Sequence, residues 1–398
     1  MNNTIKLAVA AALLAGASSA NAGIMIPAGD WTLDIGGIVN AYYTHTTFSG
    51  DAAGLGGASE RGNGDSVNNI TTGLLPNYLS VSGKTRQNDL DVGFTISINP
   101  GASTVSAGQQ GGTVGGVSNQ ENRQAFLTFG DKSWGSIKVG KDLGIYASDA
   151  ILNDMTLLGV GSGAGLLAGN TTTLGRIGTG FMYADWKSQI AYSSPNWNGF
   201  SFTAGVTQAW NAADTSSRGG GQPAFEGKAS YEWAGDVGGK VWASALSQKV
   251  EFDDVRGSDR AGAWDLGATV NLAGFGLTGY YGEGRGTGTT VLFNGGYDAL
   301  GNDRDSDDWY VQGTYTLPGV GTKLGMSYGE SVLDGNRADV VLDKLKDSMW
   351  TIGAYHPITK HLNLVAEYSD VKSDFQRKAL SDLEGKSKTV SLGAILFF

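Results

Sequence analysis

Hydrophobic and polar residues alternate along most of this chain with a period of two. In segment 90–98 the residues between the apolar ones are small, polar or charged, and the apolar row consists of Leu90, Val92, Phe94, Ile96 and Ile98. Segments 200–208, 225–233 and 390–398 repeat the pattern. Because successive side chains of a β-strand point to opposite faces, the pattern predicts strands with one apolar and one polar face.

Partitioned in this way, the chain contains sixteen candidate strands. They cover 30–46, 75–85, 89–99, 122–130, 136–141, 186–194, 200–208, 224–233, 239–249, 263–272, 276–283, 308–317, 322–330, 347–357, 361–371 and 387–398. Short connections such as 86–88 alternate with long ones such as 142–185. Short turns at one rim and long loops at the other predict an all-β fold, a 16-stranded antiparallel transmembrane β-barrel in an outer membrane.

The two rows of each strand differ in charge. The polar rows include Asp91, Glu226 and Lys228, whereas their apolar partner rows carry no charge. Lipid offers no hydrogen bonds, so a sheet that faces lipid must close and leave no edge. The apolar rows are therefore expected to face lipid, and the polar rows to line a water-filled lumen.

Residues 1–22 have the composition of a secretory signal peptide. Lys6 precedes a short apolar run, and the segment ends in Ala20-Asn21-Ala22, a small-residue cleavage pattern. We expect cleavage near Ala22 and a barrel domain over 23–398, located in the cell outer membrane of a Gram-negative bacterium.

Composition excludes several other classes of protein. The chain has no Cys, so it holds no disulfide or thiolate site, and its 38 acidic against 28 basic residues argue against nucleic-acid binding. The three His are too far apart along the predicted strands to form one catalytic cluster, and no nucleophile elbow is present. Segment 302–308 lacks the Gly and Glu of a calcium loop; it is interpreted as a solvated loop, or alternatively as a bridge to lipopolysaccharide through divalent ions. We expect no enzyme activity, no cofactor and no metal site.

Specific motifs resemble the Gram-negative trimeric porins of the sixteen-stranded group. The chain ends in an alternating apolar row that closes with Phe398, which is similar to the signal read by the barrel-assembly machinery. The Ser-Pro-Asn-Trp-Asn-Gly-Phe sequence of 194–200 resembles the family's turn between strands six and seven, and 123–141 resembles strands four and five. The resemblance implies a homotrimer, in contact with outer-membrane lipid and lipopolysaccharide, through which small solutes and ions diffuse passively.

The same resemblance implies an inward-folded third loop, here 142–185, that narrows the channel. The family's basic residue after the Gly of the fifth strand corresponds to Lys141, whereas its acidic loop motif is absent. The candidate charges at the pore constriction are Lys141, Lys138, Asp142, Asp149, Asp154, Arg123 and Arg176. Each could alternatively be a solvated charge at the channel mouth.

Two questions stay open in the sequence. The apolar, Gly-rich stretch Leu157–Gly169 either packs against the barrel wall or lines a path for hydrophobic solutes. The function is a general diffusion channel or, alternatively, a substrate-specific channel with an affinity site at the third loop; a plugged barrel with a surface role is a third option. A net charge of −10 favours a mild cation preference, which lumenal Lys138 and Lys141 could reverse.

Overall fold

The structure is a computed structural model that describes residues 23–50, 66–103, 113–114, 117–118, 120–162, 172–210, 221–252 and 257–398. The expected leader, residues 1–22, and residues 163–169 of the apolar loop stretch lie outside this part of the chain.

Strands dominate the described residues. They are β1 (Ile24–Ala28), β2 (Trp31–Gly50), β3 (Ser66–Thr71), β4 (Tyr78–Gln87), β5 (Leu90–Pro100), β6 (Thr113–Val114), β7 (Val117–Ser118), β8 (Gln120–Glu121), β9 (Ala125–Asp131), β10 (Gly135–Leu143), β11 (Trp186–Ser193), β12 (Phe200–Thr207), β13 (Ala224–Trp233), β14 (Val237–Glu251), β15 (Ser258–Leu272), β16 (Phe275–Arg285), β17 (Asp305–Thr316), β18 (Lys323–Asp334), β19 (Leu342–Pro357), β20 (Leu362–Arg377) and β21 (Leu383–Phe397). A short helix, α2 (Ser148–Asn153), and a 3-10 helix, η2 (Met155–Leu158), lie between β10 and β11. Within the described residues, no helix has the length and apolar character needed to cross a membrane.

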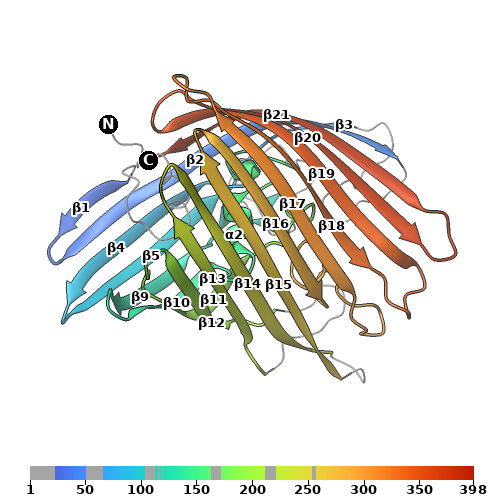
Figure 1. Ribbon diagram of the computed structural model, residues 1–398, viewed down its shortest axis with the longest axis horizontal. Helices are drawn as coiled ribbons and strands as arrows, with labels where there is room; N and C mark the ends of the chain where they lie inside the picture. Colours follow the sequence, from blue (N-terminus) through green and yellow to red (C-terminus); the bar gives the residue numbers. More distant parts are fainter. Residues whose placement is uncertain are drawn as a thin grey trace.

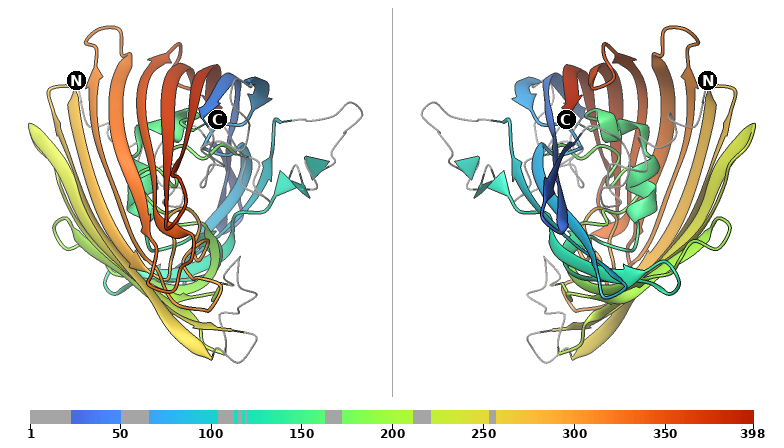
Figure 2. Two further views of the ribbon diagram at one scale, coloured as in Figure 1. Left: turned by 90° about the vertical axis from the view of Figure 1, so that its right-hand side faces the viewer. Right: turned by 90° about the vertical axis from the view of Figure 1, so that its left-hand side faces the viewer.

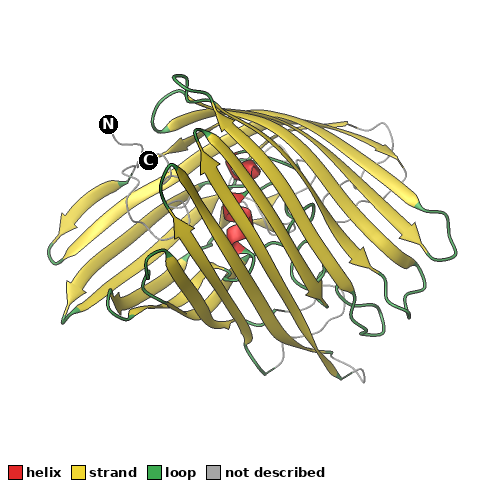
Figure 3. Cartoon of the chain, in the orientation of Figure 1, coloured by secondary structure: helices red, strands yellow, loops and turns green. Residues whose placement is uncertain are grey.

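Sixteen strands form a closed antiparallel ring, which confirms the predicted barrel. The ring consists of β2, β4, β5 and β9 to β21. It closes because β2 pairs with β4 on one edge and with β21 on the other, where Ile38 lies opposite Phe397. Figure 1 shows the strands slanting across the view, and Figure 3 shows the two short helices in red among the yellow strands.

The faces of the wall are arranged as the alternation predicted. Apolar side chains such as Val39, Ile190 and Leu277 are 55%, 55% and 64% exposed on the outside. Polar side chains of the opposite rows, such as Asn40 and Glu226, are buried. The apolar rows therefore meet lipid and the polar rows face inward, the reverse of a soluble barrel.

Several strands run further toward the long loops than the sequence predicted. β15 begins at Ser258 rather than at 263, and β20 continues to Arg377 rather than ending near 371. The outer row becomes polar in these extensions, with Arg260 on β15 and Lys372 and Asp374 on β20, so the apolar outer row that marks a strand is lost while the backbone ladder continues. At the opposite rim the turns are tight: Asn88 and Asp89 have φ of 46° and 63°, as a two-residue hairpin turn requires.

Aromatic side chains gather at two levels on the outer face. Toward the long loops the paired rings are Trp264–Tyr281, Trp309–Tyr328 and Trp350–Tyr368, with centroids 5.8, 5.6 and 5.1 Å apart. Toward the short turns Phe275 stacks on Tyr315 at 4.2 Å. Two such levels match the aromatic girdles that mark the membrane interfaces of barrels.

The two ends of the barrel domain share one edge of β2. Phe398 exchanges two backbone hydrogen bonds with Gly37, of 2.7 and 3.0 Å. On the same edge β1 begins with Ile24 opposite Ile35, so Gly23 lies beside Gly36, next to Phe398. β21 and β1 therefore lie end to end along one strand position.

Candidate functional site

Residues 144–162 and 172–185, the described parts of the segment between β10 and β11, are bound by polar side chains from distant strands. Near the start of this segment, Glu226 Oε2 on β13 accepts hydrogen bonds from the backbone N–H groups of Ile145 and Tyr146, both at 2.9 Å. Its Oε1 accepts from Thr207 at 2.8 Å and from the ammonium of Lys187. These two amides lie in buried, irregular backbone just before the N-cap Ala147 of α2, and Glu226 supplies the acceptor that they need.

A second glutamate binds the segment on another wall. Glu367 Oε2 on β20 accepts from the backbone N–H groups of Val160 at 2.7 Å and Gly161 at 2.9 Å. Its Oε1 accepts from the hydroxyl of Tyr355 at 2.5 Å. Both views of Figure 2 show α2 between the walls of strands that carry these two groups.

Uncharged side chains add further bonds between the segment and the strands. They join Met155 N to Gln312 Oε1 at 2.6 Å, Gly180 N to Ser331 Oγ at 2.9 Å, Ala147 N to Ser244 Oγ at 3.1 Å, and Tyr310 OH to Ala150 O at 3.0 Å. Irregular backbone that is buried needs such partners, because an unpaired N–H or C=O group is costly away from water. The segment is thus fixed to β13, β14, β17, β18 and β20.

Of the predicted charges, Asp149 binds two lysines that the sequence prediction had not selected. Its carboxylate lies 3.1 Å from Nζ of Lys228 and 2.6 Å from Nζ of Lys240, on β13 and β14. Lys240 also pairs with Glu232 at 3.0 Å. Burial acts to raise the pKa of Asp149, but the two ammonium groups outweigh it and the pKa lies below the usual value.

Asp154 and Arg176 form a fully buried pair within the segment. The guanidinium Nε lies 3.9 Å from Asp154 Oδ1, and Nη1 donates to the carbonyl oxygen of Met349 on β19 at 2.9 Å. Asp154 also accepts from Thr156 N at 3.1 Å, which caps η2. Burial raises the pKa of Asp154 in spite of the nearby guanidinium.

Lys138, Asp142 and Arg123 lie at the β9–β10 side of the barrel. Lys138 pairs with Asp142 on the inner row of β10, and its ammonium lies 4.8 Å from the centre of the Phe126 ring. Arg123 is buried, and its Nε donates to Glu121 at 2.7 Å. The structure therefore brings six of the seven predicted charges into ion pairs.

The register of β10 separates Lys141 from the other six. Lys138, Gly140 and Asp142 belong to the inner row of β10. Lys141 lies in the outer row together with Ile137 and Val139, next to the exposed Ser188 of β11. Its ammonium donates to the backbone oxygen of Asn122 at 2.8 Å. This placement is contrary to the expectation that Lys141 faces the constriction. The motif identified the right strand, but the alternation decides the face.

Sequence reasoning did not select the residues that bind the segment to the wall. Glu226 and Lys228 were assigned to an inward row, so their parity signalled a lumenal position. Glu367 alternates with Leu364, Ala366 and Tyr368 in the predicted strand 361–371, so the alternation also placed it in the inner row, but it did not reveal the contact. Its role depends on where residues 160 and 161 cross the barrel, which is a long-range contact.

The described residues include no group of three or more His, Cys, Asp or Glu side chains arranged to hold a metal ion. The arrangement is a network of ion pairs and hydrogen bonds around a lumen, with no nucleophile–base pair evident among the residues described above.

Comparisons with known proteins agree with this architecture. The outer membrane channel DcaP of Acinetobacter baumannii matches with a TM-score of 0.69 at 16% identity, over 95% of this chain and 100% of that chain. The anion-selective porin from Comamonas acidovorans matches with 0.62 at 17%, over 92% and 100%. OmpF of Salmonella typhi matches with 0.57 at 17%, over 93% and 100%. At these identities the likeness concerns the fold. No curated protein matches the sequence.

The profile of the family described as Gram-negative porin matches residues 8–376, more than nine-tenths of the chain. With the closed ring and its inverted faces, this match shows an outer-membrane channel for passive diffusion rather than an enzyme. The chain belongs to the Gram-negative porin family.

Proposed function

We propose that the third loop, residues 142–185, forms the constriction of a general diffusion channel with weak ion selectivity. The observation that supports this is that six of the seven predicted charges have an oppositely charged partner, while Lys323 on β18 is a lysine without an ion pair among the described residues. Lys138 is matched by Asp142, Arg176 by Asp154, and Arg123 by Glu121. An affinity site for one charged solute would need charge that is not already neutralised by a neighbour.

The group around Asp149 is a part of the constriction that ions can reach. Lys228 and Lys240 have side chains 27% and 22% exposed, whereas Asp149 is 3% exposed. Glu232, which pairs with Lys240, is 53% exposed. Two ammonium groups and two carboxylates balance, so this wall attracts neither sign of ion strongly.

Planar-bilayer recording across a KCl gradient tests the proposal. We expect a reversal potential near zero for the wild type and a shift toward anions in Asp149→Asn, because that change leaves two lysines with one acid. Asp307→Asn, on the outer face of β17, is the matched control and leaves the potential unchanged. A saturable block by one solute class would support the substrate-specific alternative, and an absence of current would support a plugged barrel.

The protein is further proposed to be a homotrimer. A solved form of OmpT from Vibrio cholerae is described as a trimer and matches this fold with a TM-score of 0.53. Three-fold conductance steps, together with chemical cross-linking in detergent, test the assembly. Single conductance steps and an uncross-linked monomer would contradict it.

The leader is proposed to be removed after Ala22. On the edge of β2, the position beside Gly37 is occupied by Phe398, and Gly23 follows it beside Gly36. This row accommodates a chain that starts at Gly23. N-terminal sequencing of protein from the outer membrane tests the site, with Gly23 as the expected first residue.

Lipid, lipopolysaccharide and the barrel-assembly machinery are the proposed partners of the wall. The exposed apolar rows need a lipid environment, and the terminal row ending in Phe398 is the segment proposed for recognition during assembly. Phe398→Ser is expected to reduce the amount of barrel in the outer membrane, measured by fractionation, without abolishing refolding in detergent.

A further inference from the structure

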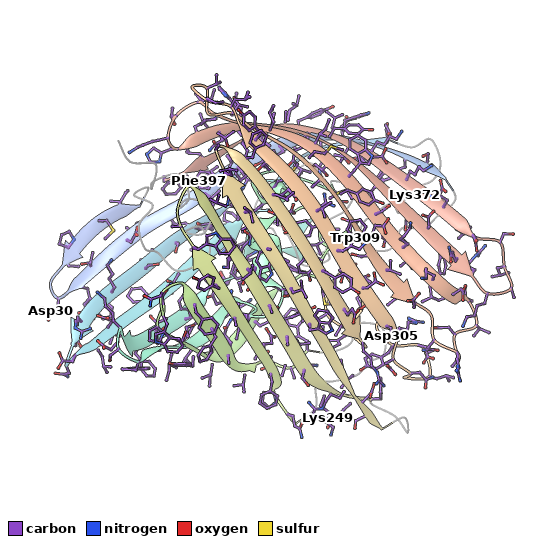
Figure 4. All side chains as sticks on the ribbon, in the orientation of Figure 1. Asp30, Lys249, Asp305, Trp309, Lys372 and Phe397 are labelled. Carbon is purple, nitrogen blue, oxygen red and sulfur yellow. The ribbon has the colours of Figure 1, made fainter. Side chains whose placement is uncertain are left out.

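Residues 286–304, the β16–β17 loop, are packed against the inner side of the barrel. They lie at its long-loop end, and Figure 4 shows Asp305, the first residue of β17, on the side away from Phe397. Within the loop, 286–290 are all buried and Phe293 is fully buried. A loop that stood in solvent would leave such residues exposed. The position of the loop is therefore held by contacts with the rest of the barrel.

The inner wall is apolar where this loop covers it. Leu246 of β14 lies opposite Ala263 of β15, and both belong to the buried, inward-facing rows of their strands. Together with Leu292, Phe293 and Tyr297 of the loop they form one apolar cluster. An inner row that met water would be polar, as it is elsewhere in this barrel. The apolar pair thus marks a part of the wall that the β16–β17 loop occupies.

The β16–β17 loop also rests on the third loop. The carbonyl oxygen of Thr290 accepts a hydrogen bond of 2.9 Å from the backbone N–H of Tyr183. Gly178 has a φ of 75° and lies so close that a Cβ on it would be 2.6 Å from the Thr290 hydroxyl oxygen. Tyr146 of the third loop belongs to the same apolar cluster as Phe293. Two chain segments are therefore in contact on this side of the lumen.

The β16–β17 loop reaches β18 as well. A Cβ at Gly295 would lie 3.3 Å from Cδ2 of Leu333, which is buried in the inner row of β18. Tyr297 packs edge to face on Phe252, just after β14, with ring centroids 5.3 Å apart. The loop therefore covers the inside of the wall from β14 to β18, and it takes this part of the cross-section away from the channel.

Arg304 holds the loop in this position. Its guanidinium makes a bidentate contact with Asp339 of the next long connection, from Nε to Oδ2 at 2.9 Å and from Nη2 to Oδ1 at 2.5 Å. Its Nη1 donates to the carbonyl oxygens of Gly295 at 2.9 Å and Tyr297 at 3.1 Å. The backbone N–H of Asn336 donates to Asp339 Oδ2 at 2.9 Å and fixes the carboxylate.

This ion pair is suited to holding a loop. The side chains of Arg304 and Asp339 are 14% and 7% exposed, so salt screens the pair less than it screens a surface pair. A bidentate contact between a guanidinium and a carboxylate also fixes their relative orientation. Arg304 is a positioning residue, because it binds the backbone of its own loop on one side and a separate loop on the other.

We propose that the β16–β17 loop sets the size limit for hydrophilic solutes that enter from the long-loop side, and that Arg304 positions it. The inference rests on the proposed diffusion channel and adds a second limiting element to the third loop. Solutes are confined to the part of the cross-section that neither loop occupies. Releasing the β16–β17 loop therefore admits larger solutes, while the strands of the wall stay in place.

Polymer exclusion in planar bilayers tests the proposal. Single-channel conductance is recorded with polyethylene glycols of increasing size on the long-loop side, and the cut-off is the size at which they no longer lower the conductance. We expect Arg304→Gln to raise the cut-off. It should also make a state of higher conductance about ten-fold more frequent, the effect of losing one hydrogen bond to a charged group.

Three further variants at charged residues show whether the ion pair is the cause. Asp339→Asn should change the cut-off as Arg304→Gln does, because it breaks the same pair from the other side. Arg304→Lys keeps the charge but loses the bidentate contact, so its cut-off should lie between those of the wild type and Arg304→Gln. Arg377→Gln is the matched control and should leave the cut-off unchanged, since Arg377 donates to the carbonyl oxygen of Ser381 within its own connection, at 2.7 Å.

A shortened loop separates a size-limiting role from a stabilising one. The backbone N–H of Gly286 donates to the Arg304 carbonyl oxygen at 2.9 Å, next to the paired residues Arg285 and Asp305. Deletion of 287–303 therefore leaves a two-residue hairpin between the same strands. This variant should have a higher conductance and a larger cut-off, whatever its thermal midpoint in detergent. If it does not fold, the cut-off of Arg304→Gln decides.

The failure of this inference can be told from that of the proposed function. A wild-type cut-off in both Arg304→Gln and the deletion variant overturns the inference, and so does an equal change in Arg377→Gln. In each of these cases the wild-type protein still conducts, and the diffusion channel stands. An absence of current in the wild type refutes the channel itself, and the size limit with it.

Discussion

Replacing Glu367 by Gln tests how firmly residues 144–185 are bound to the β20 wall. The carboxylate is buried and accepts three hydrogen bonds, from Val160 N, Gly161 N and the Tyr355 hydroxyl. It makes no ion pair with any residue that the structure describes. A glutamine keeps the shape of the side chain and one acceptor oxygen, but it removes the charge.

The magnitude follows from the number and type of these bonds. A hydrogen bond to a charged group contributes about 1.5–3 kcal/mol, and a neutral one about 1 kcal/mol. If the amide oxygen of Gln faces the two backbone N–H groups, each bond weakens by about 1 kcal/mol, or about 2 kcal/mol in total. That raises the population of the detached segment roughly 30-fold, at about 1.4 kcal/mol for each factor of ten.

Two measurements report the detached state. Single-channel recordings should show more frequent conductance fluctuations in Glu367→Gln, and amide hydrogen exchange should be faster at residues 160 and 161. Gly159→Ala should reproduce both effects, because the added Cβ would overlap Glu367 Oε1. Glu330→Gln, on the outer face of β18, is the matched control. Quiet channels with wild-type exchange in Glu367→Gln would refute the reasoning.

Three further outcomes follow from charges at or near the same segment. Burial raises the pKa of Asp185 to about 6, so the folded state binds its proton more tightly than the unfolded chain, and stability falls as the pH rises from about 4 to about 6. Asp185→Asn should therefore raise the thermal midpoint in detergent at pH 7.5 and leave it unchanged at pH 3.5; equal gains at both values would exclude this cause. Arg176→Met should destabilise the packing of the segment by about 3–5 kcal/mol, because it leaves the Asp154 carboxylate buried without its cation; proteolysis of the folded protein measures this, and wild-type resistance would count against it. Lys323, whose ammonium lies 5.0 Å from the centre of the Tyr355 ring, makes no ion pair with the described residues, so Lys323→Gln should move the reversal potential toward cations, and an unmoved potential would place this lysine outside the ion path.

The membrane-facing part of the fold could be predicted from the sequence, because lipid imposes a simple rule on it. Every second residue of a membrane-spanning strand must be apolar. Apolar residues such as Val39 and Leu277 therefore identify the face of the strand that meets lipid. The rule ends where the strands leave the membrane. For this reason the extensions of β15 to Ser258 and of β20 to Arg377 were missed, although the backbone pairing there is continuous.

The candidate site was predictable in residue type more than in arrangement. Asp149 and Arg176 were selected as charged residues of the third loop that the family resemblance implies, and both are in ion pairs. Their partners Lys228 and Met349 come from strands far along the chain, so no local pattern reveals the contacts. The prediction for Lys141 was wrong because it followed a family motif, although the alternation along the strand already placed residue 141 in the outer row.

The meeting of Gly23 and Phe398 beside β2 has a consequence for engineering. The two residues occupy successive places on one edge, so a direct peptide link would turn β21 and β1 into a single unbroken strand. A cyclic permutant joined there and reopened within 378–382 should then assemble the same wall. The chain would then start at a different strand of the barrel, while each strand kept the same two neighbouring strands.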